Sequence, residues 1–268
     1  MQEMKMPENL LKKITYHSET CNKHVKPTKM MIIDGIPVCP KCELEQEQRK
    51  FEENVQQEIK QAMLNKKYNT LYNRSILQDN TLLNATLDNY VVTQQEETKN
   101  KLMVIKSIEH YRDGETFNLI LQGNQGAGKS HLAYATLREL NSLETSCLFV
   151  NVESMLRLIK DSFSNRESKY TENYFIELMS EVDYLVLDDI GAETGAIDTD
   201  KTATDFVQRV LYAITTTRQD KSTIITTNLK GETLFKMYDR KLVSRLFKKP
   251  KYIMFNATKD KRMNDIPF

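Results

Sequence analysis

The sequence predicts an α/β protein with a parallel β-sheet, preceded by a small N-terminal unit that a metal ion stabilises. Apolar runs of strand length alternate with helical patterns from residue 117 to residue 255. A glycine-rich loop joins the first of these strands to its helix, and a later strand, Tyr184–Leu187, ends in two consecutive acids. Strands that alternate with helices form parallel sheets, because each helix carries the chain back over the sheet.

The glycine-rich loop predicts a binding site for the phosphates of a nucleotide. An apolar run, Phe117–Leu121, precedes it and a helical pattern follows. The spacing is that of a P-loop, in which glycines let backbone N–H groups close around an anion and the new helix adds its own. Lys129 is expected to reach the β- and γ-phosphates, and Ser130 to ligate Mg²⁺. The loop residues are Gly123, Asn124, Gln125, Gly126, Ala127, Gly128, Lys129 and Ser130.

The strand Tyr184–Leu187 ends in Asp188 and Asp189. In open α/β sheets, ligands bind at the edge formed by the carboxyl ends of the strands. We therefore expect Asp188 to hold Mg²⁺, directly or through water. Asp189 is expected to polarise the attacking water as a general base.

The remaining apolar patterns supply the other elements in order. The β-branched run Ser222–Asn228 predicts a strand whose final amide can hold the attacking water near the γ-phosphate. Strands are also expected at Ser146–Asn151 and Tyr252–Phe255, and helices at Gln94–Tyr111, Ser154–Phe163, Glu172–Met179, Thr202–Arg218, Glu232–Tyr238 and Arg240–Lys249. A basic group after the second strand fits either a DNA-binding surface or a solvated helix face. Its members are Arg157, Lys160, Arg166 and Lys169.

The N-terminal unit carries two pairs of potential zinc ligands, Cys21 with His24 and Cys39 with Cys42. Three sulfurs and one imidazole make a closed tetrahedral set, so the predicted zinc site is structural. Between the pairs, Asp34-Gly35 separates two apolar runs and predicts a β-hairpin that brings the ligands together. His17 is an alternative fourth ligand. Residues 1–20 are expected to form a frayed start or a short helix.

Residues 43–67 are charged and contain no proline or glycine, which predicts a helix. Its narrow apolar stripe fits a connecting helix and a partner-binding helix equally well. Residues 68–83 lack a clear period and are expected to form a loop. We therefore expect a zinc-binding domain at residues 1–45, a helical linker at 46–83 and a nucleotide domain at 84–268. The stripe consists of Leu44, Phe51, Val55, Ile59 and Met63.

Composition limits the possible partners and the compartment. The net charge of +1 gives no general attraction to nucleic acid, so any DNA contact must come from a local patch. No apolar run reaches membrane-spanning length and no signal-peptide core appears, which predicts a cytoplasmic protein. Clustered cysteines in such a protein favour metal over disulfides. Cys147, in a strand-like run, is expected to be buried and inert.

These motifs together resemble the AAA+ ATPase domain of the DnaC/DnaI/IstB helicase-loader group, over roughly two-thirds of the chain. The segments that carry the resemblance are Asn84–Tyr90, Gly123–Leu132, Leu187–Glu193, Ile224–Leu229 and Ser244–Leu246. The resemblance implies a five-stranded parallel sheet of order 5-1-4-3-2 with helices on both faces. It also implies that a full C-terminal helical lid is absent.

The resemblance assigns roles to individual residues. Lys129 and Ser130 correspond to Walker A, Asp188 and Asp189 to Walker B, and Asn228 to sensor 1. Arg245 is the expected arginine finger, reaching a neighbour's γ-phosphate, with Arg240 as the alternative. The nucleotide-binding set comprises the loop residues with His131 and Asp188. Many AAA+ motors carry glutamate where this chain has Asp189, so we expect slow, switch-like ATP hydrolysis.

The functional expectation is an ATP-dependent loader that places a DnaB-type hexameric helicase on single-stranded DNA when replication begins. ATP, Mg²⁺ and Zn²⁺ are the expected cofactors, and the AAA+ domain is expected to self-assemble. A zinc-bearing N-terminal domain resembles the DnaI branch, where it grips the helicase, and the compact chain resembles phage loaders. Two alternatives remain: an IstB-like transposition helper, or a nucleotide-binding module that sequesters a host replication protein.

Overall fold

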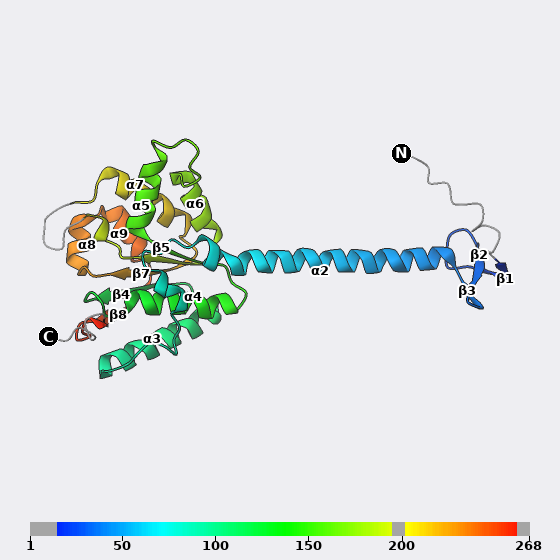
Figure 1. Cartoon of the computed structure of the whole chain (residues 1–268), viewed down its shortest axis with the longest axis horizontal. Helices are drawn as coiled ribbons and strands as arrows, with labels where there is room; N and C mark the ends of the chain where they lie inside the picture. Colours follow the sequence, from blue (N-terminus) through cyan, green and yellow to red (C-terminus); the bar gives the residue numbers. More distant parts are fainter. Residues whose placement is uncertain (1–14, 195–201, 262–268) are drawn as a thin grey trace. The chain divides into compact units, whose positions relative to one another are not determined.

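The computed structural model describes residues 15–194 and 202–261 (Figure 1). Contacts divide the chain into two compact units, Met1–Met63 and Leu64–Phe268. The domain limits expected at residues 45 and 83 stay a prediction. Within the described ranges, the helices lack the long apolar stretch that crossing a membrane requires.

The N-terminal unit contains a three-stranded antiparallel sheet of β1 (Thr15–Cys21), β2 (Thr28–Ile33) and β3 (Ile36–Val38). Asp34 and Gly35, with φ of 50° and 81°, form the predicted tight turn between β2 and β3. The expectation of a frayed start or short helix is wrong for β1. Its polar residues show no alternation, and pairing with β2 makes it a strand. Residues 1–14 lie outside the described ranges.

Helix α2 (Pro40–Arg74) begins with a proline at its first position, where the missing N–H costs no hydrogen bond. It extends past Lys67, where we expected a loop to begin. The last turns are helical because Leu71, which is fully buried, packs with the partly buried Tyr72 into the core of the second unit. In the apolar stripe, Phe51 and Met63 are exposed.

The second unit contains a five-stranded parallel sheet in the order β5-β6-β7-β4-β8. Numbered from the strand before the glycine loop, this is the predicted order 5-1-4-3-2. The strands are β4 (Asn118–Gly123), β5 (Cys147–Asn151), β6 (Tyr184–Asp188), β7 (Ser222–Thr227) and β8 (Pro250–Phe255). The α/β fold is confirmed.

Helices cover both faces of this sheet (Figure 1). Alternate side chains of β4 point to opposite faces: Ile120 joins one core with α5 to α9, and Leu119 and Leu121 join the other with α3 and α4. The helices are α3 (Gln95–Arg112), α4 (Lys129–Ser142), α5 (Val152–Ser162), α6 (Glu172–Glu181), α7 (Asp205–Thr217), α8 (Gly231–Met237) and α9 (Arg240–Leu246), with short 3₁₀ turns η1 (Asn80–Asn84) and η2 (Ala192–Thr194).

Arg218 and Cys147 are two of the buried side chains of the second unit. Arg218 donates hydrogen bonds to the carbonyls of Met179 (2.6 Å), Val182 (2.9 Å) and Ser222 (2.7 Å), so it ties the end of α6 to β7. Cys147 on β5 is fully buried, and this burial raises the pKa of its thiol to about 12. The expectation of a buried strand cysteine is confirmed.

Candidate nucleotide-binding and zinc-binding sites

The glycine loop runs from the end of β4 to the start of α4, as the P-loop spacing predicts. Gly123 and Gly128 occupy positions that require glycine. A Cβ on Gly123, at φ 144°, would lie 2.2 Å from the carbonyl oxygen of Phe255 on β8. A Cβ on Gly128, at φ 82°, would lie 2.6 Å from the Tyr90 ring. The backbone of the loop therefore lies close to β8 and to the Tyr90 ring. Its left-handed residues turn the chain into α4.

Lys129 is held inside this loop. Its Nζ donates hydrogen bonds to the carbonyl oxygens of Gly123 (2.9 Å) and Asn124 (2.7 Å), and to Oδ1 of Asn228 at 2.7 Å. The side chain is buried. The structure thus brings together the loop lysine and the amide after β7, which lie 99 residues apart in the sequence.

Asp188 lies beside Ser130, as expected for two residues that share a metal ion. Burial and the neighbouring charge of Asp189 raise the pKa of Asp188 to about 6, although hydrogen bonds from Ser130, Thr226 and Asn151 oppose this shift. A hydroxyl and a carboxylate are the oxygen ligands that Mg²⁺ accepts, and the cation would offset the cost of burying the carboxylate. The donor set therefore fits Mg²⁺.

Asp189 has a left-handed backbone conformation, with φ of 58°. Its N–H donates to Oγ1 of Thr226 at 2.8 Å, and the next N–H, of Ile190, donates to the Thr226 carbonyl at 3.0 Å. Left-handed residues other than glycine carry strain that persists only where neighbours impose it. Here β7 imposes it, at the carboxylate expected to orient water.

The segment before α3 packs against the start of α4. The Tyr90 hydroxyl donates to the Ala127 carbonyl (3.2 Å), and the Tyr90 ring meets the His131 ring edge-on at 5.5 Å. Burial, followed by nearby lysine charges, lowers the pKa of His131 despite a hydrogen bond to the Thr86 carbonyl. A neutral His131 therefore donates from Nε2 to that carbonyl, 2.9 Å away.

Arg245 lies at the opposite edge of the sheet from the glycine loop. The side-chain amide of Asn118, at the start of β4, donates to the carbonyls of Arg245 (3.3 Å) and Leu246 (2.9 Å). The loop begins at the other end of β4, about 17 Å away at roughly 3.3 Å per residue. The Arg245 guanidinium lies 4.2 Å from the centre of the Tyr212 ring, and Arg240 on the same helix is exposed. Arg245 therefore does not reach its own loop.

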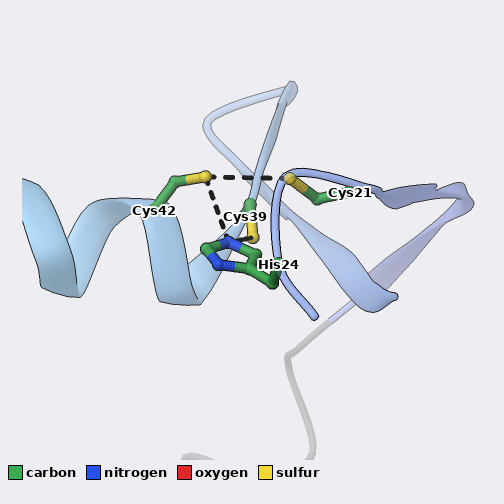
Figure 2. A group of neighbouring side chains, drawn as sticks. All are labelled: Cys21, His24, Cys39 and Cys42. Atoms are coloured by element: carbon green, nitrogen blue, oxygen red, sulfur yellow. Dashed lines mark hydrogen bonds between the residues drawn. The ribbon is translucent and has the colours of Figure 1, made fainter. Parts of the chain in front are cut away.

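The four predicted zinc ligands converge in the N-terminal unit (Figure 2). Cys21 Sγ lies 3.7 Å from Cys42 Sγ, and His24 Nε2 lies 3.4 Å from Cys39 Sγ and 3.3 Å from Cys42 Sγ. Around a tetrahedral zinc ion, two sulfurs lie about 3.8 Å apart, and a sulfur and a nitrogen about 3.5 Å. The alternative ligand His17 faces Glu19 instead. The cluster therefore fits zinc.

The electrostatics of this cluster also favour a cation. Burial acts to raise the pKa of Cys39, but hydrogen bonds from the Cys42 backbone, Cys21 and His24 outweigh it and lower the pKa to about 7. Burial and the two neighbouring cysteines raise the pKa of Cys42 to about 11. Cys39 therefore loses its proton readily, whereas Cys42 resists deprotonation. A bound dication would favour the thiolate form of both cysteines. His24 Nδ1 lies 3.3 Å from Glu45 Oε1, the outer carboxylate typical of zinc-bound histidine.

Comparison with known families agrees with this geometry. The model of the IstB-like ATP binding protein family matches residues 42–248, which is most of the chain. The chain belongs to this family. The match includes the glycine loop, both acids, Asn228 and Arg245, so the predicted resemblance is confirmed.

Relatives of this IstB-like chain include the replicative helicase loader DnaC of Escherichia coli K12, which is 34% identical over 111 residues. That alignment covers 41% of this chain and 44% of the relative. The corresponding loader of Buchnera aphidicola (Acyrthosiphon pisum) is 32% identical over 115 residues, covering 42% and 45% of the two chains. The chain therefore matches less than half the length of these curated relatives.

Solved structures support the AAA+ P-loop fold of the IstB-like unit. A DnaC helicase loader superposes with a TM-score of 0.54 at 23% identity, covering 66% of this chain and 99% of the other. A structure of DnaI gives 0.53 at 22% identity, covering 67% and 95%. A putative primosome component from Streptococcus pyogenes gives 0.55 at 21%, covering 73% and 96%. At these identities the likeness establishes the fold.

Two residues of the IstB-like site, Asn151 and Thr226, were not predicted from the sequence. The packing of Tyr90 against the glycine loop was not predicted either. Asn151 is the last residue of β5 and Thr226 the last but one of β7, the strands on either side of β6, and both contact Asp188. A polar residue at the end of each neighbouring strand was the available signal. Only the parallel register of β5, β6 and β7 makes the three side chains meet.

Proposed function

We propose that this chain is an ATPase that loads the replicative hexameric helicase onto single-stranded DNA. The observation that supports it most is the convergence of Lys129, Ser130, Asp188, Asp189 and Asn228 at the carboxyl edge of one parallel sheet. This set supplies each function that triphosphate hydrolysis needs: phosphate binding, metal binding, and orientation of water. We place the protein in the cytoplasm, where a replicative helicase works.

Each residue acts on a defined atom in the proposed reaction. The N–H groups of the loop bind the phosphates, and Lys129 leaves the loop carbonyls to contact the β- and γ-phosphates. Ser130 and Asp188 would hold Mg²⁺, which would neutralise the charge of the phosphate oxygens. Asp189 accepts the proton of the attacking water, and Asn228 orients that water. Because aspartate is shorter than glutamate, slow turnover is expected.

Arg245 is proposed to act on the nucleotide of an adjacent subunit. Its place at the far edge of the sheet prevents contact with its own loop, and its guanidinium keeps its charge and can bind two phosphate oxygens at once. Leaving the Tyr212 ring would free it for this contact. Arg240, exposed on the same helix, is the alternative.

A surface on α5, the following loop and α7 is proposed to contact single-stranded DNA. Phe163 is exposed and meets Phe206 edge-on at 5.8 Å, with the Lys160 ammonium 5.6 Å from the Phe206 ring. Exposed rings stack on bases and lysines bind phosphates, without sequence preference. Further basic residues that extend this surface are Arg157, Arg166 and Lys169.

The N-terminal unit is proposed to bind the helicase. Zinc would hold its small sheet, because a unit of this size cannot bury a sufficient core. The unit exposes apolar side chains that offer a contact surface: Tyr16 and Ile36 on its strands and Val25 in the loop between β1 and β2. The names of the DnaC relatives point to the same partner.

Size-exclusion chromatography of the purified chain with its host's replicative helicase, with and without Mg²⁺ and ATP, tests this function. A loader co-elutes with the helicase and releases it after hydrolysis. Co-elution without ATP hydrolysis would favour the sequestering module. ATP hydrolysis stimulated by duplex DNA, without helicase binding, would favour the transposition helper.

A further inference from the structure

One buried hydroxyl joins the two acids of the candidate site. Thr226 on β7 is fully buried, and its Oγ1 donates to Oδ1 of Asp188 at 2.7 Å. The same oxygen accepts the N–H of Asp189 at 2.8 Å. A hydroxyl has one proton, so this arrangement fixes its rotation: the proton points at Asp188 and a lone pair at Asp189.

The bond to Asp189 acts on the direction of the catalytic side chain. Asp189 has φ of 58°, and its N–H and that of Ile190 both bind Thr226. An L-residue in this conformation relaxes when its restraints are lost. A change in φ at Asp189 would swing its carboxylate away from the position that the left-handed backbone gives it.

The bond to Asp188 acts on the metal ligand. A carboxylate has several lone pairs, and occupying one with Thr226 fixes which face remains for a cation and for Ser130. Outer hydrogen bonds of this kind orient the ligands of metal sites. Thr226 thus sets the orientation of both acids from the neighbouring strand.

We propose that Thr226 is a positioning residue for ATP hydrolysis, holding Asp188 and Asp189 in register with the phosphate loop. The proposal rests on the ATPase activity proposed above. It predicts a defect in turnover, because the hydrogen bonds of the Thr226 side chain go to the two acids and not to the phosphate loop.

Steady-state hydrolysis of ATP at saturating Mg²⁺ by the full chain tests this role. Thr226→Val keeps the shape and removes the hydroxyl, and kcat is expected to fall about 10- to 100-fold, the usual effect of losing such an outer contact. The KM for ATP should change less than about threefold, because uniform binding is untouched. Thr226→Ser restores the hydroxyl and should recover kcat to within about threefold.

Thr223→Val is the matched control. Thr223 lies on the same strand, is also buried, and accepts a hydrogen bond from Arg218 Nε at 3.2 Å, at the opposite end of β7. It should lower the melting temperature and leave kcat unchanged. If Thr226→Val fails to fold, Thr226→Ala and Thr226→Ser give the same comparison.

Three results would overturn the proposal: parental kcat in Thr226→Val, no recovery in Thr226→Ser, or an equal loss of kcat in Thr223→Val. Each leaves the proposed ATPase activity standing. A parent chain that hydrolyses no ATP, with or without single-stranded DNA, would instead overturn both.

Discussion

Lys129 Nζ and Asn228 Oδ1 lie 2.7 Å apart, so the loop lysine and the amide after β7 are hydrogen-bonded. The lysine also donates to two carbonyls of its own loop. In the proposed function, phosphate binding draws Lys129 from these partners, so the side chain at position 228 is expected to influence how readily Lys129 leaves them.

Replacing Asn228 with Asp should weaken ATP binding more than replacing it with Ala. A carboxylate at this position would form a charged pair with Lys129 and repel the γ-phosphate, with an expected loss of affinity of about tenfold or more. Asn228→Ala removes a neutral acceptor and should keep affinity within about threefold while hydrolysis is lost. Calorimetric titration with a non-hydrolysable ATP analogue measures the affinity of both variants. Equal affinity of the two variants would show that Asn228 does not influence Lys129.

Asp188→Asn should stabilise the nucleotide-free and Mg²⁺-free protein. The folded pKa of Asp188, about 6, exceeds its ordinary value of 3.8. The folded state therefore resists ionisation, and the parent loses stability as the pH rises from about 4 to about 6. The advantage of the variant should grow over this range and level off above it, at about 1–3 kcal/mol. Urea unfolding at several pH values checks this.

Asp183→Asn serves as the control with the opposite sign. Burial acts to raise the pKa of Asp183, but hydrogen bonds from the Ser146 N–H and hydroxyl, with the charges of Lys67 and Lys221, lower it. Its ionised form therefore stabilises the fold above its ordinary pKa, and Asp183→Asn should destabilise the protein at neutral pH. A stabilising Asp183→Asn, or a destabilising Asp188→Asn, would contradict this account.

The purified chain should carry about one zinc ion, given one tetrahedral ligand set. Cys39→Ser should abolish zinc binding and unfold the N-terminal unit, while ATP binding by the second unit remains. Atomic absorption and far-ultraviolet circular dichroism measure the two effects. Cys147→Ala is the control, since this cysteine lies in the other unit. The Cys147→Ala variant should bind as much zinc as the parent chain. A zinc-free chain purified without chelator would refute the site.

Arg245→Ala should bind ATP normally and lose hydrolysis stimulated by single-stranded DNA. An arginine finger typically contributes about 10³-fold or more to phosphoryl transfer, and a slow switch less. Mixing Arg245→Ala with Lys129→Ala, each inactive alone, should restore part of the activity, because some interfaces join an intact pocket to an intact arginine. Mixtures that co-assemble and stay inactive would argue for Arg240.

The parts of this molecule that were predictable are those that the sequence encodes locally. The glycine spacing defines the loop, and buried strands of the parallel sheet appear as short apolar runs. The strand β1 could not be predicted, because its polar residues become a strand only by pairing with β2. Thr226 was missed for a similar reason, since its contacts depend on how β6 and β7 align. The position of Arg245 relative to the glycine loop could not be predicted, because it depends on where α9 packs against the sheet.

Because Cys147 is buried, thiol labelling can show which of the two units has unfolded. Accessible thiolates react with alkylating reagents, whereas buried thiols do not. In the metal-loaded chain the three N-terminal cysteines are expected to be held by the metal and Cys147 is buried, so little labelling is expected. Removing the metal should expose Cys21, Cys39 and Cys42, and the fourth thiol of the sequence should react only when the parallel sheet itself unfolds. A time course of labelling would thus report the loss of each unit separately, in a single unmodified chain.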